Sequence, residues 1–185
     1  MRLSVIGPPG SGKSTQAKML VQKLKLPHVY VGGLLREEVK RGTELGKKVR
    51  SSMDEGGLVG DDLVLALFFN RVEQEDCRSG FIADATPRTI YQAEKIEERI
   101  PFDKVLFVRV SLSAAKQRLL DRERKDDTEE AISRRFRVYE EATRPIVEFY
   151  RARGKLVEVD GEGSVEDVTM EILKKLGVGG AKHGD

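Results

Sequence analysis

The 185-residue chain lacks several features that would place it in a specialised class of protein. With one cysteine, Cys77, it cannot form an intrachain disulfide, which fits a reducing compartment. Its 33 basic and 31 acidic side chains nearly cancel, so the net charge of +2 predicts binding to neither nucleic acid nor a membrane. The longest strongly apolar run, Leu63 to Phe69, is too short to span a bilayer. Since no signal peptide is evident either, we expect a soluble cytoplasmic protein.

The sequence does contain a regular alternation of short apolar runs with helical patterns. Five runs are expected to be strands, at residues 3–6, 28–31, 80–84, 104–110 and 155–159. Because most of these runs are apolar throughout, they predict an α/β fold in which helices cover both faces of a parallel sheet. We expect one domain over residues 1–177, followed by a flexible tail at 178–185.

Two stretches of helical pattern are longer than a simple connection between parallel strands. The first runs from about residue 32 to 74 and is broken at Gly42 and at Gly56-Gly57. The second runs from about 113 to 153 and is interrupted near 122–127. Long insertions of this kind are candidates for mobile elements that cover a site.

A glycine-rich segment follows the first expected strand. Residues 7–14 read GPPGSGKS and match the pattern G-x-x-x-x-G-K-[ST], with a helix expected directly after them at 13–24. Glycines let the backbone wrap closely around a phosphate, and the positive end of the helix dipole faces the same place. Lys13 can reach the β and γ phosphates, and the Ser14 hydroxyl can ligate Mg²⁺. The segment predicts binding of a nucleoside triphosphate without indicating what receives the phosphate.

Charged residues at the end of the third expected strand point to the same chemistry. Asp84 ends this strand and Arg88 follows it, where parallel sheets bind their ligands. A carboxylate at this position can orient Mg²⁺ or its waters, and a guanidinium binds phosphate through two parallel donors. Further arginines that can stabilise a transferring phosphoryl group lie in the two long insertions, at Arg36, Arg118, Arg122, Arg124 and Arg135.

Taken together, these segments resemble the adenylate kinases, within the wider group of nucleoside-monophosphate kinases, over nearly all of residues 1–177. The likeness rests on residues 7–16, 33–36, 57–59, 87–94, 124–127 with Arg135, and 139–145. It implies a P-loop NTPase fold with a five-stranded parallel sheet, a helical subdomain at 31–60 for the monophosphate, and a minimal lid at 122–127. It also implies reversible transfer of the γ-phosphoryl group of ATP to AMP, giving two ADP, with Mg²⁺ as cofactor and these nucleotides as partners.

The resemblance also assigns roles to individual residues. ATP is expected to contact Gly10, Ser11, Gly12, Lys13, Ser14, Thr15, Arg118, Arg122 and Gly163. AMP is expected to contact Val31, Arg36, Gly57, Leu58, Val59, Ala85, Arg88, Gln92, Arg124 and Arg135. The residues expected to act in catalysis are Lys13, Arg88, Arg122, Arg124 and Arg135, and those expected to hold Mg²⁺, partly through water, are Ser14 and Asp84.

Some positions depart from the family pattern and suggest relaxed selectivity for the bases. Val31 stands where a threonine is usual, Gly33 replaces an acidic residue, and Ala85-Thr86 replaces a glycine and an aromatic residue beside the monophosphate. A lost hydrogen bond is worth about 0.5–1.5 kcal/mol, so CMP, UMP or GMP could serve as acceptors. Only Glu123 separates Arg122 from Arg124, and so short a lid suggests loose selectivity for the donor triphosphate as well.

Two alternatives stay open at this level. One is a kinase for pyrimidine monophosphates or another small metabolite, and the other is a P-loop ATPase or regulatory module that switches a partner. Arg36 and Arg88 favour an acceptor that already carries phosphate, and neither a water-positioning residue nor a partner surface is apparent. The dominant bases, the oligomeric state, the rates and the working temperature do not follow from the sequence.

Overall fold

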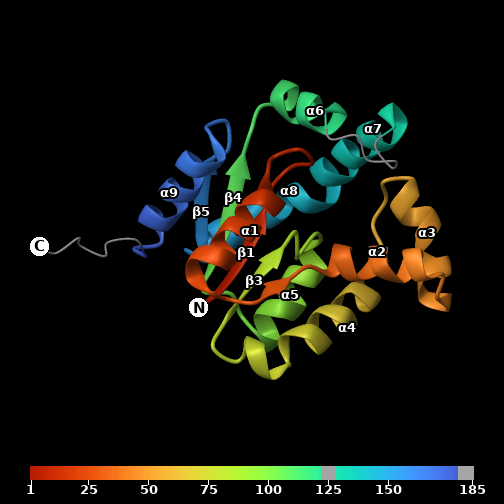
Figure 1. Cartoon of the computed structure of the whole chain (residues 1–185), viewed down its shortest axis with the longest axis horizontal. Helices are drawn as coiled ribbons and strands as arrows, with labels where there is room; N and C mark the ends of the chain where they lie inside the picture. Colours follow the sequence, from red (N-terminus) through yellow and green to blue (C-terminus); the bar gives the residue numbers. More distant parts are fainter. Residues whose placement is uncertain (122–127, 179–185) are drawn as a thin grey trace, which may run out of the picture.

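A computed structural model describes residues 1–121 and 128–178 of the chain (Figure 1). Its single sheet has five parallel strands in the order β2-β3-β1-β4-β5. The strands are β1 (Arg2–Ile6), β2 (His28–Val29), β3 (Phe81–Asp84), β4 (Lys104–Arg109) and β5 (Leu156–Asp160). The α/β fold with a parallel sheet, predicted from the five apolar runs, is therefore confirmed.

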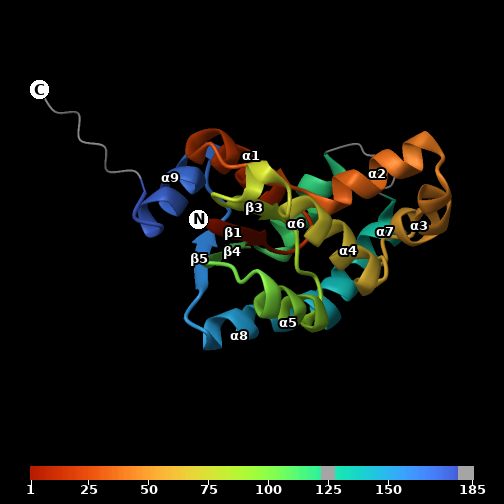
Figure 2. The same cartoon turned by 90° about the horizontal axis from the view of Figure 1, so that it is seen from below.

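Helices cover both faces of the sheet (Figure 2). One face carries α1 (Lys13–Leu24) and α9 (Val165–Lys175), and the other carries α4 (Asp61–Val72), α5 (Ile90–Arg99) and α8 (Arg144–Ala152). Phe68 of α4, Phe81 of β3, Phe102 and Tyr150 of α8 pack edge to face in the core between the sheet and this second layer. This burial explains why the 63–72 segment is a core helix.

The first helical insertion forms a hairpin that projects from the carboxyl edge of the sheet (Figure 1). It consists of α2 (Val31–Arg41) and α3 (Glu44–Asp54), joined at Gly42, which has φ +68° and ends α2 in a left-handed conformation. Thr43 caps α3 by accepting a hydrogen bond from the Gly46 amide at 3.1 Å. A Cβ at Gly46 would lie 2.1 Å from the Glu38 carbonyl oxygen, so the two helices approach closely only because this residue is glycine.

The second insertion contains α6 (Leu112–Leu120), α7 (Glu129–Val138) and a short π-helix (Tyr139–Thr143) that leads into α8. Thr128 caps α7 through its side chain. The lid expected at 122–127 and the tail from 179 onward lie outside the described residues. Within 1–121 and 128–178, no helix has both the length and the apolar character needed to cross a membrane.

The predicted extent of the second strand is wrong. β2 ends at Val29, and the apolar Val31 begins α2 instead of continuing the strand. The Tyr30 carbonyl accepts hydrogen bonds from the amides of Gly33 and Leu34, which starts the helix. β2 is an edge strand that pairs only with Ile82 and Ala83, so backbone pairing does not extend it and the helical bonds at Tyr30 prevail.

Candidate active site

The glycine-rich segment forms a tight loop between β1 and α1. Gly10 and Gly12 have φ of +79° and +84°, a region that favours glycine, and a Cβ at Gly10 would lie 2.2 Å from the Ala115 carbonyl oxygen. The Lys13 ammonium donates to the Pro8 carbonyl at 3.1 Å, across the mouth of the loop. With α1 beginning at Lys13, the loop has the backbone conformation and helix dipole of an anion site.

A hydroxyl and a buried carboxylate meet behind the loop. The Ser14 hydroxyl of α1 donates to Asp84 Oδ1 at 2.8 Å, and the Asp84 side chain is only 1% exposed. Among the described residues, Asp84 Oδ2 has no hydrogen-bond partner. His28 Nε2 lies 3.3 Å from this oxygen, but the two atoms are not aligned for a hydrogen bond. Oxygen ligands with spare capacity beside a phosphate loop are of the type that Mg²⁺ prefers.

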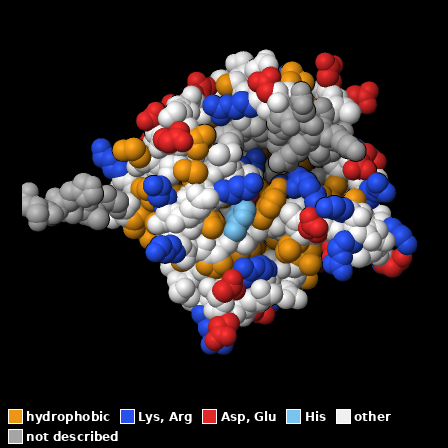
Figure 3. Space-filling view, viewed as in Figure 1, with side chains coloured by type: hydrophobic (Ala, Val, Ile, Leu, Met, Phe, Trp, Pro, Cys, Tyr) orange, Lys and Arg blue, Asp and Glu red, His pale blue; other side chains and the backbone are white. Residues whose placement is uncertain are grey.

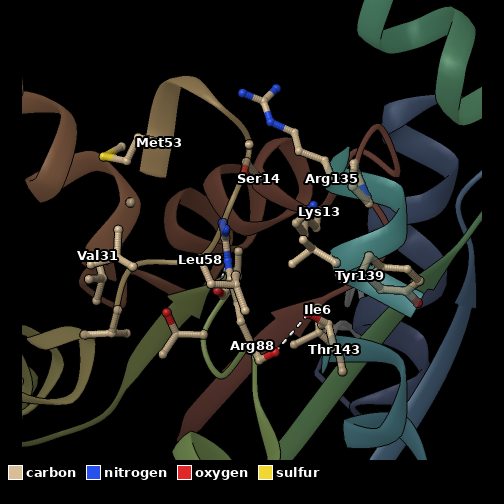
Figure 4. Close-up of a pocket in the computed structure, with 18 of the residues that line it drawn as sticks. Ile6, Lys13, Ser14, Val31, Met53, Leu58, Arg88, Arg135, Tyr139 and Thr143 are labelled. Atoms are coloured by element: carbon tan, nitrogen blue, oxygen red, sulfur yellow. Dashed lines mark hydrogen bonds between the residues drawn. The ribbon is translucent and has the colours of Figure 1, made fainter. Parts of the chain in front are cut away.

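A deep pocket opens next to the loop, at the carboxyl edge of the sheet (Figures 3 and 4). In the space-filling view, several blue basic side chains lie along the rim of the hollow. The residues expected from the sequence to bind nucleotide that line the pocket are Gly10, Lys13, Ser14, Val31, Arg36, Gly57, Leu58, Val59, Ala85, Arg88, Gln92 and Arg135. One cavity thus contains residues from both expected nucleotide sites.

Arg88 is held rigidly at the floor of this pocket. Its Nε donates to the Ala85 carbonyl at 3.1 Å, and its own carbonyl accepts from Thr143 Oγ1 at 2.9 Å (dashed in Figure 4). Burial lowers the pKa of the Arg88 guanidinium, and the charges of Arg36 and Arg135 lower it further against the opposing effects of Tyr30 and Asp84. An arginine stays charged at any physiological pH, so this site holds a buried positive charge suited to an anion.

Helix α7 brings Arg135 over the same pocket. The turn after α3 packs against α7 so closely that a Cβ at Gly56 would lie 2.9 Å from the Arg135 Cγ and 2.7 Å from the Ala131 carbonyl oxygen. Arg134, next to it, forms an ion pair of 2.6 Å with Glu55. The hydrogen bond from Ser51 lowers the pKa of the Glu55 carboxyl, and the contact with Arg134 lowers it further. The first and second insertions therefore meet at the pocket.

The part of the pocket beside α2 is mainly apolar. Val31, Leu35, Met53, Leu58, Val59 and Val64 line it. Gln92 lies on its edge, where its Oε1 accepts from the Arg88 amide and its Nε2 donates to Asp61 Oδ1, both at 2.8 Å. An amide has two acceptor and two donor positions, so Gln92 retains one of each for a ligand.

Several residues expected to bind ATP lie outside the pocket lining. Ser11 is buried inside the loop, Thr15 is exposed on α1, and Gly163 is exposed between β5 and α9. Arg118 of α6 donates to the Gly161 carbonyl at 3.0 Å, which places it beside the phosphate loop and the turn before α9. Arg122 and Arg124 fall outside the described residues.

The structure also brings to the site residues to which the sequence assigned no role. Tyr30, Met53, Leu119, Tyr139 and Thr143 all line the pocket, and His28 lies against Asp84. Tyr139 is mostly buried, and burial raises its pKa to about 12. Tyr30 had a local signal, since it stands at the end of an expected strand before two glycines, and Tyr139 and Thr143 lie in the segment 139–145 that carries the likeness.

A glycine-rich loop between the first strand and the first helix, at the carboxyl edge of a parallel sheet, defines a P-loop nucleotide-binding protein. More specifically, the chain belongs to the adenylate kinase family, because the sequence model of that family, described as "Adenylate kinase", matches residues 5–155. It is 36% identical over 217 residues to an adenylate kinase of Alkaliphilus oremlandii, spanning 96% of this chain and 99% of the relative. It is 41% identical over 185 residues to that of Stenotrophomonas maltophilia (95% and 99%) and 42% identical over 181 residues to adenylate kinase 1 of Nostoc sp. (95% and 98%).

Proposed function

We propose that this member of the family transfers the γ-phosphoryl group of ATP to AMP, giving two ADP. The observation that carries the proposal is the convergence of Lys13, Arg36, Arg88 and Arg135 on one pocket beside the phosphate loop. The loop is suited to the phosphates of the donor, and the arginine-lined part to the phosphate of the acceptor.

The transfer needs positive charge and exclusion of water more than it needs a base. An oxygen of the acceptor phosphate, already anionic, attacks the γ-phosphorus while the bond from that phosphorus to the β–γ bridging oxygen breaks. Lys13, Arg88 and Arg135 line the pocket and would neutralise the charge on the transferring group, whose negative charge is spread over its oxygens. The closing elements expected at 31–60 and 122–127 would keep water from acting as acceptor.

Magnesium fits the residues behind the loop. When bound with the triphosphate, the metal would supply positive charge that offsets the negative charge of the phosphates. Ser14 would ligate it directly, and the unpartnered Asp84 Oδ2 would hold its waters. In 1–121 and 128–178, no three acidic, histidine or cysteine residues are grouped to hold a metal alone, and in this proposal the nucleotide and water supply the remaining ligands.

The test measures the amounts of ATP, AMP and ADP over time in a mixture of ATP, Mg²⁺, AMP and the protein. The proposal requires two ADP to form for each AMP consumed, and ATP to be consumed only in the same amount as AMP. ATP loss that does not depend on AMP would favour the P-loop ATPase or regulatory module, and transfer to UMP or CMP but not AMP would favour a pyrimidine monophosphate kinase. The relatives are named adenylate kinases and support neither alternative.

Selectivity for the acceptor base is expected to be loose. The Val31 side chain is 2% exposed at the apolar end of the pocket and offers no hydroxyl to a base. We expect a preference for AMP over CMP, UMP and GMP well below a thousandfold, measured as kcat/KM for each acceptor. Val31→Thr should raise the preference for AMP by about tenfold, the worth of one hydrogen bond. Val29→Thr on the buried strand is the matched control and should leave the preference unchanged. A thousandfold preference for AMP in the unaltered protein would contradict the expectation.

Selectivity for the donor base is also expected to be loose. Among the described residues, Arg118 and the turn at Gly161 are the elements beside the loop that could contact a base, and the expected lid is only about six residues long. We therefore expect GTP, CTP and UTP to phosphorylate AMP measurably. Initial rates at saturating AMP will check this, and rates a thousandfold below that of ATP for all three would show that the donor site is selective.

A further inference from the structure

We propose that Tyr30 positions Arg36 for the acceptor phosphate, by holding one nitrogen of its guanidinium so that its other donors are free for the ligand. Tyr30 would thus be a positioning residue for the proposed reaction. The inference rests on the proposed function, because it concerns the same acceptor site.

Tyr30 and Arg36 are joined by a hydrogen bond and by a cation–π contact. Arg36 Nη1 donates to the Tyr30 hydroxyl oxygen, and the guanidinium carbon lies 5.7 Å from the centre of the Tyr30 ring. The same Nη1 donates to the Gly32 carbonyl at 3.2 Å. Both hydrogens of Nη1 are therefore used, which fixes the orientation of the planar group.

The remaining donors of Arg36 are available. In the part of the chain that the structure describes, Nη2 and Nε of Arg36 have no hydrogen-bond partner. Arg36 and Tyr30 both line the pocket. An arginine binds phosphate best through two parallel N–H groups, and Nε with Nη2 supplies such a pair. Holding Arg36 by Nη1 thus leaves the useful edge of the guanidinium exposed to an incoming phosphate and lowers the entropy lost on binding.

The surroundings of Tyr30 are arranged to keep its ring in this place. A Cβ at Gly33 would lie 2.6 Å from the ring carbon Cδ1, and one at Gly32 would lie 3.1 Å from Cε2. The ring also stacks on His28, with centroids 5.7 Å apart and an angle of 15°. Two consecutive glycines in the first turn of α2 weaken that helix, and the space needed by the tyrosine ring accounts for them.

The first experiment compares the unaltered protein with Tyr30→Phe, which keeps the ring and removes the hydroxyl. We expect the KM for AMP to rise about tenfold, as for one lost hydrogen bond to a charged group, with kcat, the KM for ATP and the unfolding temperature nearly unchanged. Calorimetric titration with AMP should show the same loss of affinity. A KM for AMP within twofold of the unaltered value would overturn the inference.

The second experiment uses the glycine that makes room for the ring. Gly33→Ala should raise the KM for AMP in the unaltered protein, because the added methyl displaces the ring, but should have no effect in a Tyr30→Ser background. Gly60→Ala is the control, since no atom lies within 4 Å of a Cβ there and its φ is −51°. Equal effects of Gly33→Ala in both backgrounds would refute the role of the ring.

The two experiments separate failure of this inference from failure of the proposed function. An unaltered protein that makes no ADP from ATP and AMP would overturn both. An active protein whose KM for AMP does not change on substitution of Tyr30 or Gly33 would overturn this inference alone.

Discussion

Arg88→Met is expected to lower kcat/KM for AMP by about a thousandfold or more, the effect of removing an arginine that stabilises a transferring phosphoryl group. The side chain lies at the floor of the pocket, and the Ala85 carbonyl and the Thr143 hydroxyl hold it and its backbone in place. Neutral methionine has a similar length but cannot bind an anion. The KM for ATP should change by less than about threefold, because Arg88 faces the acceptor.

Two measurements separate this effect from damage to the fold. Since burial and the neighbouring arginines lower the pKa of Arg88, its charge is unfavourable in the folded protein, and its removal should leave the unfolding temperature unchanged or raised. Arg99→Met is the matched control, because Arg99 lies on the exposed surface against Phe69 and Glu73, away from the pocket. If Arg88→Met lowered kcat/KM for AMP by less than tenfold, or if Arg99→Met lowered it equally, the assignment of Arg88 to the acceptor site would be wrong.

Lys13→Met is expected to lower kcat by about a thousandfold, the scale found for donors that stabilise charge in a transition state. The ammonium lies at the loop, in the pocket that Arg88 and Arg135 also line. Binding of AMP should persist in this variant, while turnover is lost. Rapid-quench measurement of a single turnover tests this directly, because it reports the transfer step without product release.

The control for this substitution is Lys18→Met, on the same helix but exposed to solvent. It should retain full activity. Lys13 also donates to the Pro8 carbonyl, so its replacement should reduce the free energy of unfolding by about 1 kcal/mol, which circular dichroism can verify. Retention of more than a tenth of kcat in Lys13→Met would show that the loop holds nucleotide without helping the transfer.

The two variants are expected to differ in how well they bind AMP. Arg88→Met should bind ATP normally and AMP weakly, and Lys13→Met should bind AMP normally. This pattern is expected only when the loop and the arginine-lined region hold different nucleotides. If both variants lost affinity for the same nucleotide, a single nucleotide site would explain the result, and the ATPase alternative would gain support.

Where the sequence predicted structure well, the information was local. The glycine-rich loop, the helix at 13–24 and the apolar strands each follow from the residues of one short segment, and the structure has them within a residue or two. The second strand was the failure, because Val31 has the apolar, β-branched character of a strand residue. Its true conformation depends on a helix start at Tyr30 and on the lack of further pairing at the sheet edge.

The site shows the same division. Lys13, Ser14, Arg36 and Arg88 could be predicted as site residues because fixed spacing and the resemblance mark them, and all four line one pocket in the structure. Tyr30 was missed because a single tyrosine before two glycines matches no motif, although its partner Arg36 is only six residues away. His28 and Tyr139 were missed because the residues beside them at the pocket lie far away in the chain, such as Asp84 for His28. No local pattern reports a contact of that kind.

By itself, then, the sequence determined the family, the phosphate loop and the order of strands and helices, since these depend on local backbone preferences and on hydrophobic period. Only the tertiary structure decided that the arginines of two insertions share one pocket, that Asp84 is buried against Ser14 and His28, and that Tyr30 holds Arg36. The physical reason is that burial, charge and hydrogen bonding depend on which residues lie close together in space, and packing of the folded chain decides that.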